Sequence, residues 1–166
     1  TEAFFNMGIT YQSQALFEKA IESYENAVKL QPGFYEAIGN IGTIKQLQGD
    51  LDNAIKYFEK ALNINEDGRG HYNLAGALRN HGSLSIAIVH YKKAIELNTN
   101  EPEFYSDLGD ALWHDGQIKE ANKFLRLAVK VNPSHLRANY QLAIFLYDNK
   151  MFEEAINYFE ASRFQD

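Results

Sequence analysis

Apolar residues recur along the chain at intervals of three or four, which is the spacing of one face of an α-helix. The pattern is clearest between residues 38 and 62, where Gly49 and Asp50 separate two apolar series. The first series is Ile38, Ile41, Ile44 and Leu47, and the second is Leu51, Ile55, Phe58 and Leu62. This stretch therefore predicts two helices joined by a tight turn.

The same two-helix pattern returns at a nearly constant interval. Five alanines stand 34, 33, 34 and 34 residues apart, and a large apolar residue lies four positions after each. The alanines are Ala20, Ala54, Ala87, Ala121 and Ala155, and the large residues are Tyr24, Phe58, Tyr91, Leu125 and Phe159. Such a period is typical of a solenoid of stacked helical hairpins, in which neighbouring repeats complete each other's core.

Small residues and helix breakers mark the parts of each hairpin. A small residue in every first helix lets its axis approach the second helix of the same repeat. These residues are Gly8, Gly42, Ala75, Gly109 and Ala143. Glycines at 49, 82 and 116 suit the left-handed backbone of the turn between the two helices. Prolines at 32 and 133 follow the second helix and stop it from continuing.

These features resemble the tetratricopeptide repeat (TPR) family, whose signature is W-x2-L-G-x2-Y, then A-x3-F, A and P. The first repeat matches it at Phe4, Met7, Gly8, Tyr11, Ala20, Tyr24, Ala27 and Pro32. The resemblance implies an all-α fold, a right-handed α-solenoid superhelix of about five hairpins and about ten helices. On this interpretation the chain is a single array with repeats 1–34, 35–67, 68–101, 102–135 and 136–166, the last of them incomplete.

The junction between the second and third repeats is one residue short and contains Gly68 and Gly70. One interpretation is a trimmed loop. The other is a hinge or a local change of pitch, since glycine weakens the start of the adjoining helix. The pattern leaves both open.

Composition narrows the range of functions. Hydrophobic residues make up 45% and charged residues 23%, as in a soluble folded protein, and the net charge of -6 disfavours nonspecific nucleic-acid binding. The absence of cysteine excludes disulfides and thiolate metal sites. No apolar run approaches the roughly 20 residues that a membrane span needs, and no signal peptide is visible. We therefore expect a cytoplasmic protein that binds neither nucleic acid nor membrane.

No motif of catalysis or cofactor binding is present. The five histidines fall in different repeats or at different repeat positions, and none forms H-E-x-x-H. The chain contains no P-loop, G-x-S-x-G or dinucleotide fingerprint. We expect no catalytic residue, no metal site and no cofactor, so the chain by itself is not predicted to be an enzyme.

The TPR resemblance implies a concave groove lined by positions 2, 5, 6, 9, 12 and 13 of each repeat. Position six is Asn6, Asn40, Asn73, Asp107 and Gln141. A carboxamide both donates and accepts, so a row of them can pair with an extended peptide backbone at about 0.5–1.5 kcal/mol per bond. This row is similar to the asparagine ladder of O-GlcNAc transferase TPR superhelices. Asp107 interrupts it, because an ionised carboxylate only accepts.

A less specific interpretation of the same amides stays open. They would then bond to neighbouring helices or water and keep the groove polar. A carboxylate clamp of the kind that grips chaperone tails is not expected, because only Asn40, Arg69 and Asn73 match it and its Lys–Asn half is missing.

The second half of the predicted groove is richer in charged and aromatic residues. The further candidate peptide-binding residues are Arg79, Asp110, Trp113, His114, Tyr140 and Tyr147. Acidic groups beside aromatic rings suit a peptide that carries basic or aromatic residues. Trp113, the only tryptophan, either packs between neighbouring first helices or anchors a partner.

Three functions are compatible with this pattern. The favoured one is an interaction scaffold that binds an extended peptide or a partner protein in the groove. The second is the substrate-recognition region of a larger enzyme, such as a glycosyltransferase, with catalysis outside this chain. The third is self-association through apolar solenoid ends, which carry Phe4 and Phe5 at one end and Ile156, Phe159 and Phe164 at the other.

Overall fold

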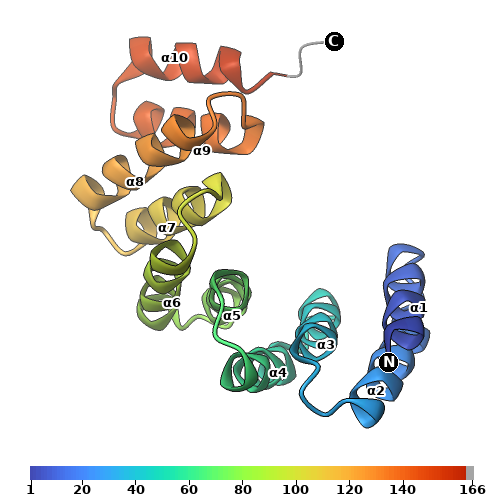
Figure 1. Cartoon of the computed structure of the whole chain (residues 1–166). Coiled ribbons are helices and arrows are strands. Elements are labelled where there is room, and N and C mark those ends of the chain that lie inside the picture. Colours follow the sequence, from blue (N-terminus) through green and yellow to red (C-terminus); the bar gives the residue numbers. More distant parts are fainter. Residues whose placement is uncertain (164–166) are drawn as a thin grey trace. The chain divides into compact units, whose positions relative to one another are not determined.

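The computed structural model describes residues 1–163, and within this range it contains ten helices (Figure 1). The first helices of the repeats are α1 Glu2–Ser13, α3 Tyr35–Leu47, α5 Gly68–Asn80, α7 Pro102–His114 and α9 Leu136–Asp148. The second helices are α2 Phe17–Leu30, α4 Leu51–Ile64, α6 Leu84–Leu97, α8 Ile118–Val131 and α10 Phe152–Ala161. The all-α prediction is confirmed, and each predicted repeat holds two helices. Phe164 lies outside the described residues.

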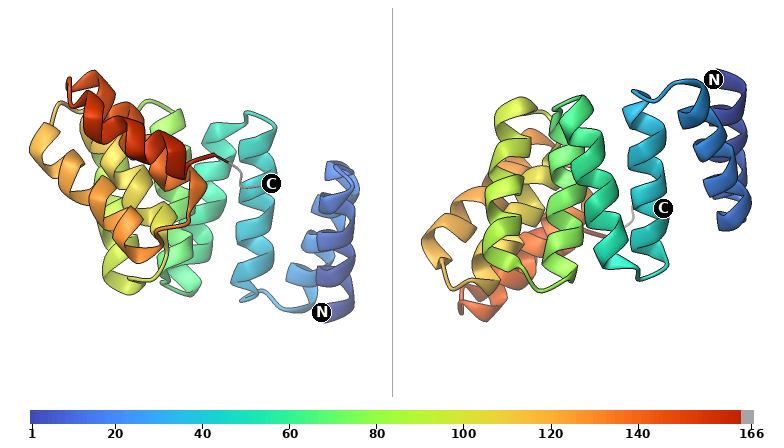
Figure 2. Two further views of the ribbon diagram at one scale, coloured as in Figure 1. Left: turned by 90° about the horizontal axis from the view of Figure 1, so that it is seen from above. Right: turned by 90° about the horizontal axis from the view of Figure 1, so that it is seen from below.

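The helices form two compact units, residues 1–83 and the part from residue 84 onward. In the first unit α1 packs on α2, α3 packs on α4, and α5 packs on α4; in the second, α7 packs on α8 and α9 on α10 (Figure 2). Second helices also contact the next first helix, as α2 contacts α3 and α8 contacts α9. None of the helices within residues 1–163 is long and apolar enough to cross a membrane.

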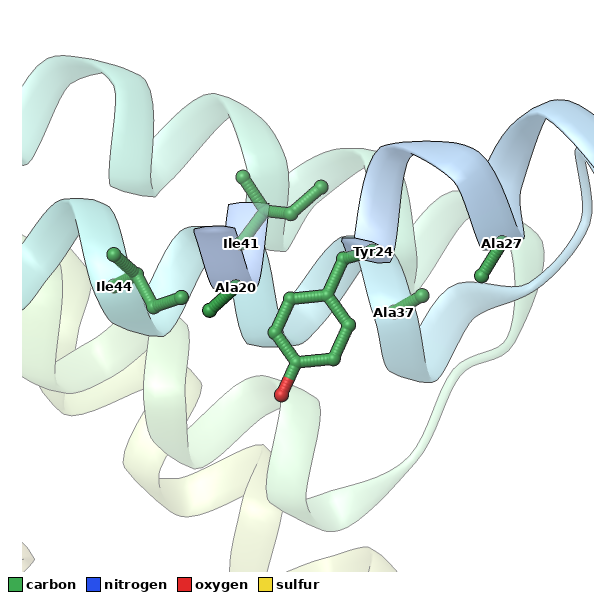
Figure 3. Packing of buried hydrophobic residues seen from close by; sticks show 6 residues of the cluster. All are labelled: Ala20, Tyr24, Ala27, Ala37, Ile41 and Ile44. Atoms are coloured by element: carbon green, nitrogen blue, oxygen red, sulfur yellow. The ribbon is translucent and has the colours of Figure 1, made fainter. Parts of the chain in front are cut away.

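In the first repeat the residue at position 24 packs within its own hairpin and against the next one. In the first repeat Tyr24 is fully buried and lies among Ala20 of its own helix and Ala37 and Ile41 of α3 (Figure 3). A Cβ on Gly8 would lie 2.5 Å from a ring carbon of Tyr24. The small residue of the first helix therefore makes room for the large residue of the second.

The other two glycines at this position show the same relation. A Cβ on Gly42 would come 2.9 Å from the Phe58 ring, and one on Gly109 would come 2.7 Å from Leu125 Cγ. Both distances are shorter than real Cβ contacts allow. The predicted close approach of the two helices is confirmed in these repeats.

The turn between the helices has a left-handed residue in all five repeats. Glycine provides it at 49, 82 and 116, with φ of 79°, 92° and 80°. In the first and fifth repeats the same place is taken by Ala15 (φ 56°) and Lys150 (φ 64°). Left-handed backbone costs a residue with a Cβ about 1 kcal/mol or more, so these two turns are strained where the other three are not.

The glycine-rich start of α5 has a packing explanation. Asp67 caps the helix by accepting the Gly70 N–H at 2.6 Å, and a Cβ on Gly70 would come 2.7 Å from Leu62 of α4. Glycine at 70 therefore lets α4 and α5 approach closely. The hinge interpretation of this junction stays a prediction.

Candidate functional site

The first helices of residues 1–83 carry three of the predicted rungs, and the structure brings two of them together. Neighbouring helices α3 and α5 place Asn40 and Asn73, both half-buried, on the wall of one cavity. Asn6 on α1 is exposed and does not line this cavity. Of the three predicted rungs in this unit, two therefore line one cavity on adjacent first helices.

The cavity has a volume of about 310 Å³, and its apolar lining comes from Phe5 of α1 and from Phe58, Ala61 and Leu62 of α4. Phe58 and Ala61 are buried, so Phe5 and Leu62 present more of this lining. Glu36, Asn65 and Arg69 line the cavity with the two amides. An apolar lining with a few polar groups is typical of ligand pockets, and this volume is at the small end of their range.

Asn40 also takes part in the core of the first repeat. The hydroxyl of Tyr24 donates to Gln12 Oε1 at 2.8 Å. Burial raises the pKa of Tyr24, and a hydrogen bond from Asn40 opposes this rise. A carboxamide has two N–H donors and an acceptor oxygen, so this one bond does not exhaust the pairing capacity of Asn40.

Charges of both signs lie around the entrance. A hydrogen bond to Glu36, together with burial and the negative charges of Glu36 and Asp67, raises the pKa of Tyr35. The guanidinium of Arg69 lies over the Tyr72 ring, 5.5 Å from its centroid. The entrance therefore offers acceptors, donors and aromatic faces within one small region.

Position six has a different role in the second unit. Asp107 of α7 is only 3% exposed, and its carboxylate accepts from Arg137 at 2.5 Å and from Gln141 at 3.4 Å, both on α9. The two predicted rungs Asp107 and Gln141 are thus brought together, but they are joined to each other and to a cation. The negative charge that we expected to attract a basic peptide is compensated within the protein at this point.

Two buried acceptors lie on the same helices. Glu103 Oε2 and Gln141 Oε1 have no hydrogen-bond partner among residues 1–163. Burial of an unpaired polar atom is costly. Glu103 stands at position two of its repeat, which the sequence places on the predicted groove.

Trp113 packs between neighbouring first helices. Its ring makes an edge contact with Phe145 of α9, with centroids 5.5 Å apart, and remains half-buried. His114 follows it in the chain. The Nδ1 atom of His114 lies 2.9 Å from the carbonyl oxygen of Asp110 and 3.7 Å from its carboxylate. Asp110, Trp113 and His114 therefore form one cluster at the end of α7.

The remaining predicted residues lie on α5 and α9. Tyr140 and Tyr147 of α9 are 52% and 56% exposed, and their rings contact Phe159 and Phe152 of α10. Arg79 is half-buried in the last turn of α5. Among residues 1–163 the structure groups no three side chains that could hold a metal ion.

Comparison with protein-family models identifies tetratricopeptide repeats in the chain. Models of the tetratricopeptide repeat match residues 1–34 and 35–100. A model of subunit 3 of the anaphase-promoting complex, or cyclosome, matches residues 80–162. The two tetratricopeptide repeat models together cover residues 1–100, which is more than half of the chain.

Known proteins resemble the chain over different lengths. Protein O-mannosyl-transferase TMTC1 of Mus musculus is 41% identical over 69 residues, which are 42% of this chain but only 7% of that protein. The chain therefore corresponds to a small part of this relative.

Among solved structures, PilF of Pseudomonas aeruginosa superimposes with a TM-score of 0.89 at 19% identity, covering 99% of this chain and 77% of that one. YrrB, described as a TPR protein with an unusual peptide-binding site, has a TM-score of 0.74 at 24% identity, covering 96% and 82%.

Proposed function

Because this chain belongs to the tetratricopeptide repeat family, we propose that it is a non-catalytic scaffold that binds an extended peptide of a partner protein along its first helices. The observation that carries the proposal is that Asn40 of α3 and Asn73 of α5 line the same cavity, which also has an apolar lining. The amides pair with the peptide backbone, and the cavity receives a side chain.

Two further facts support this function. The related fold of YrrB is that of a protein described as having a peptide-binding site. The amides are also only partly used inside the protein, since Asn40 has one assigned bond and three hydrogen-bonding groups. A ladder similar to that of O-GlcNAc transferases is proposed here for Asn40 and Asn73, with Asn6 as an outlying rung.

The second unit contributes a separate contact region in this proposal. Asp110, Trp113 and His114 on α7, with Tyr140 and Tyr147 on α9, suit basic or aromatic residues of the partner. Asp107 acts through Arg137 as a positioning residue, because its charge is already paired. Gln141 presents a buried oxygen that a donor of the partner would satisfy.

The experiment is a peptide selection on the whole chain, followed by calorimetry with the selected peptide. We expect Asn40→Ala and Asn73→Ala each to weaken binding about 2- to 10-fold, the effect of losing one net hydrogen bond. Asn63→Ala, an exposed position on the second helix α4, is the matched control and should not change affinity. Failure to select any peptide, or equal effects of all three variants, would contradict the proposal.

A second candidate is favoured by the resemblance to a protein named as an O-mannosyl-transferase. The chain would then be the substrate-recognition region of a larger transferase whose catalysis lies outside these residues. The full-length reading frame tests this candidate. A large α/β domain in the same polypeptide supports the enzyme, and a further adaptor domain or a membrane segment supports the scaffold.

Self-association is a further proposal, since α1 and α10 expose apolar residues. Met7 is 45% exposed, whereas Ile41 and Leu74 at the same repeat position are buried, and Ile156 of α10 is 55% exposed. Light scattering over a range of concentrations measures it. A mass that stays monomeric at all concentrations would contradict it.

A further inference from the structure

Successive repeats meet through one recurring surface of the first helix. In the second repeat, Ala37 and Ile41 lie beside Tyr24 of the preceding repeat (Figure 3). Residues at positions three, seven and ten are at most 2% exposed in the second, fourth and fifth repeats. They are Ala37, Ile41 and Ile44, then Phe104, Leu108 and Ala111, and finally Ala138, Leu142 and Phe145. These positions form the face on which the preceding second helix packs.

The same face of α1 is open. Ala3 and Thr10 are exposed, and Met7 is 45% exposed. Phe4 lies next to this face and is half-buried. The α1 face, defined by Ala3, Met7 and Thr10, therefore offers a mainly apolar surface that a second helix covers in the other repeats.

The complementary surface is open on α10. Position 24 is at most 1% exposed in Tyr24, Phe58, Tyr91 and Leu125, against which the next first helix packs. Phe159, at the same position, is only half-buried. At position 21, Ile156 is 55% exposed, whereas Ile88 is 6% exposed. The α10 face, defined by Ile156 and Phe159, is thus the counterpart of the α1 face.

Charged residues mark the register in which successive repeats meet. Lys92 at position 25 pairs with Glu120 at position 19 of the next repeat, at 3.2 Å. Arg126 at position 25 pairs in the same way with Glu154 at position 19, at 2.8 Å. An ion pair between these two positions therefore joins the third repeat to the fourth and the fourth to the fifth.

The two open faces carry opposite charges at these positions. Position 25 of the fifth repeat is Glu160, and position 19 of the first repeat is Lys19. Both residues are exposed. A first repeat that docked on the α10 face in the same register would therefore bring a lysine to a glutamate, and such charge complementarity fixes register and orientation.

We propose that the chain associates head to tail, with the α1 face of one copy on the α10 face of a second copy and Lys19 paired with Glu160. This inference rests on the self-association proposed above and names its surfaces and its register. The paired charges select a second copy over an unrelated apolar helix. Because the two faces differ, each contact leaves one face of each kind free, so assembly continues beyond the dimer.

The first test is sedimentation velocity of the whole chain over a wide range of concentrations. We expect a weight-average mass that rises with concentration and passes that of a dimer. An association that stops at the dimer would overturn the head-to-tail arrangement, because an interface between two identical surfaces closes at two copies.

Charge reversal tests the register. Lys19→Glu and Glu160→Lys should each weaken association at least ~3-fold, and a double variant that carries both should regain the affinity of the wild type. Lys60→Glu and Glu25→Lys are matched controls, since each reverses an exposed charge elsewhere on a second helix and should leave association unchanged. A double variant as weak as the single variants would overturn the register.

The apolar contact is tested at Met7. Met7→Glu should weaken association at least ~10-fold, because it puts a carboxylate into the apolar contact. Met7 is half-exposed, so this variant should fold, and an unchanged thermal transition verifies it. Undiminished association of the folded variant would overturn the assignment of the α1 face.

These outcomes are distinguishable from those of the proposed peptide binding. A chain that stays monomeric at every concentration overturns this inference and self-association together, while the affinity of a selected peptide for Asn40 and Asn73 is measured independently by calorimetry. Association that ignores Lys19 and Glu160 overturns the register alone. Association with the expected charge dependence, in a chain that selects no peptide, supports this inference and contradicts peptide binding.

Discussion

The two units use the same repeat positions on their first helices for different purposes. In residues 1–83, position six holds Asn40 and Asn73 beside a cavity that opens at Gly39. In the second unit, position six holds Asp107 and Gln141, which are tied to Arg137 and to each other. One repeat scaffold thus carries an open polar surface in one unit and an internal ion-paired surface in the other.

The second helices of the two units also differ, in the ion pairs that join successive repeats. Lys92 pairs with Glu120 at 3.2 Å, and 34 residues later Arg126 pairs with Glu154 through two contacts of 2.5 and 2.8 Å. Both pairs join successive repeats of the second unit. In the first unit the corresponding residues of the first two repeats are Glu25 and Asn53, which cannot form an ion pair. The second unit therefore joins successive repeats with ion pairs at repeat positions where the first two repeats have none, and Asn53 donates to Asp50 of its own repeat instead.

The largest expected effect comes from two glycines on α3. Gly42→Leu should lower the free energy of unfolding by about 3 kcal/mol, because a Cβ there already meets the Phe58 ring at 2.9 Å. Gly39→Leu should raise it by about 1 kcal/mol, because leucine favours the helix and the site is open. Urea denaturation measures both. Destabilisation by Gly39→Leu would show that the space beside Gly39 is not open.

The second prediction concerns position six. Asp107→Asn should cost about 1–2 kcal/mol, less than a fully buried ion pair, because Arg137 is half-exposed. Asn73→Ala, its counterpart in the first unit, should cost less than about 1 kcal/mol and act mainly on peptide affinity. If thermal unfolding found the two losses equal, the distinction between the units at this position would be wrong.

Acid should affect the Arg126–Glu154 pair. Its hydrogen bond with Arg126 holds the pKa of Glu154 below the ordinary value, against the opposing effect of burial. The pair therefore contributes stability above the unfolded pKa of about 4.3, and this contribution is lost as pH falls through the lower folded value. Wild type should lose more unfolding free energy than Glu154→Gln between about pH 5 and pH 3. Parallel pH profiles would contradict this role.

The smallest effects are expected at the left-handed turns. Ala15→Gly in the first unit and Lys150→Gly in the second should each stabilise the fold by up to about 1 kcal/mol, because both residues have positive φ. The matched control is Gly49→Ala, which should cost about 1–2 kcal/mol at φ 79°. Differential scanning calorimetry of the three variants checks the signs. Destabilisation by either new glycine would exclude strain at that turn.

The hairpin architecture was predictable because its determinants are local and repeated. Position eight is small, position 24 is large, and prolines follow second helices, so each feature is visible several times in one sequence. The left-handed Ala15 and Lys150 were not predictable from their residue types, because neither favours that backbone. Only the repeat position that Ala15 and Lys150 share with Gly49 indicates a left-handed backbone at these residues.

The site was predictable in part. Repeat register puts these residues at one repeat position, and the structure places Asn40 and Asn73 on one cavity and joins Asp107 to Gln141. Their role in binding stays a prediction. It did not predict that Arg137 neutralises Asp107, because that contact depends on which way a long side chain of the next repeat turns. The cavity was missed for a different reason. Gly39, one of its lining residues, has no side chain, and sequence patterns draw attention to side chains that are present.

The most direct test of peptide binding by the first helices is an isotope-filtered NOE spectrum of the labelled chain with an unlabelled selected peptide. We predict NOEs from a side chain of the peptide to Gly39 and Leu62, and from its backbone to the side-chain amides of Asn40 and Asn73. NOEs confined to the second helices, with none to α3 or α5, would contradict the account.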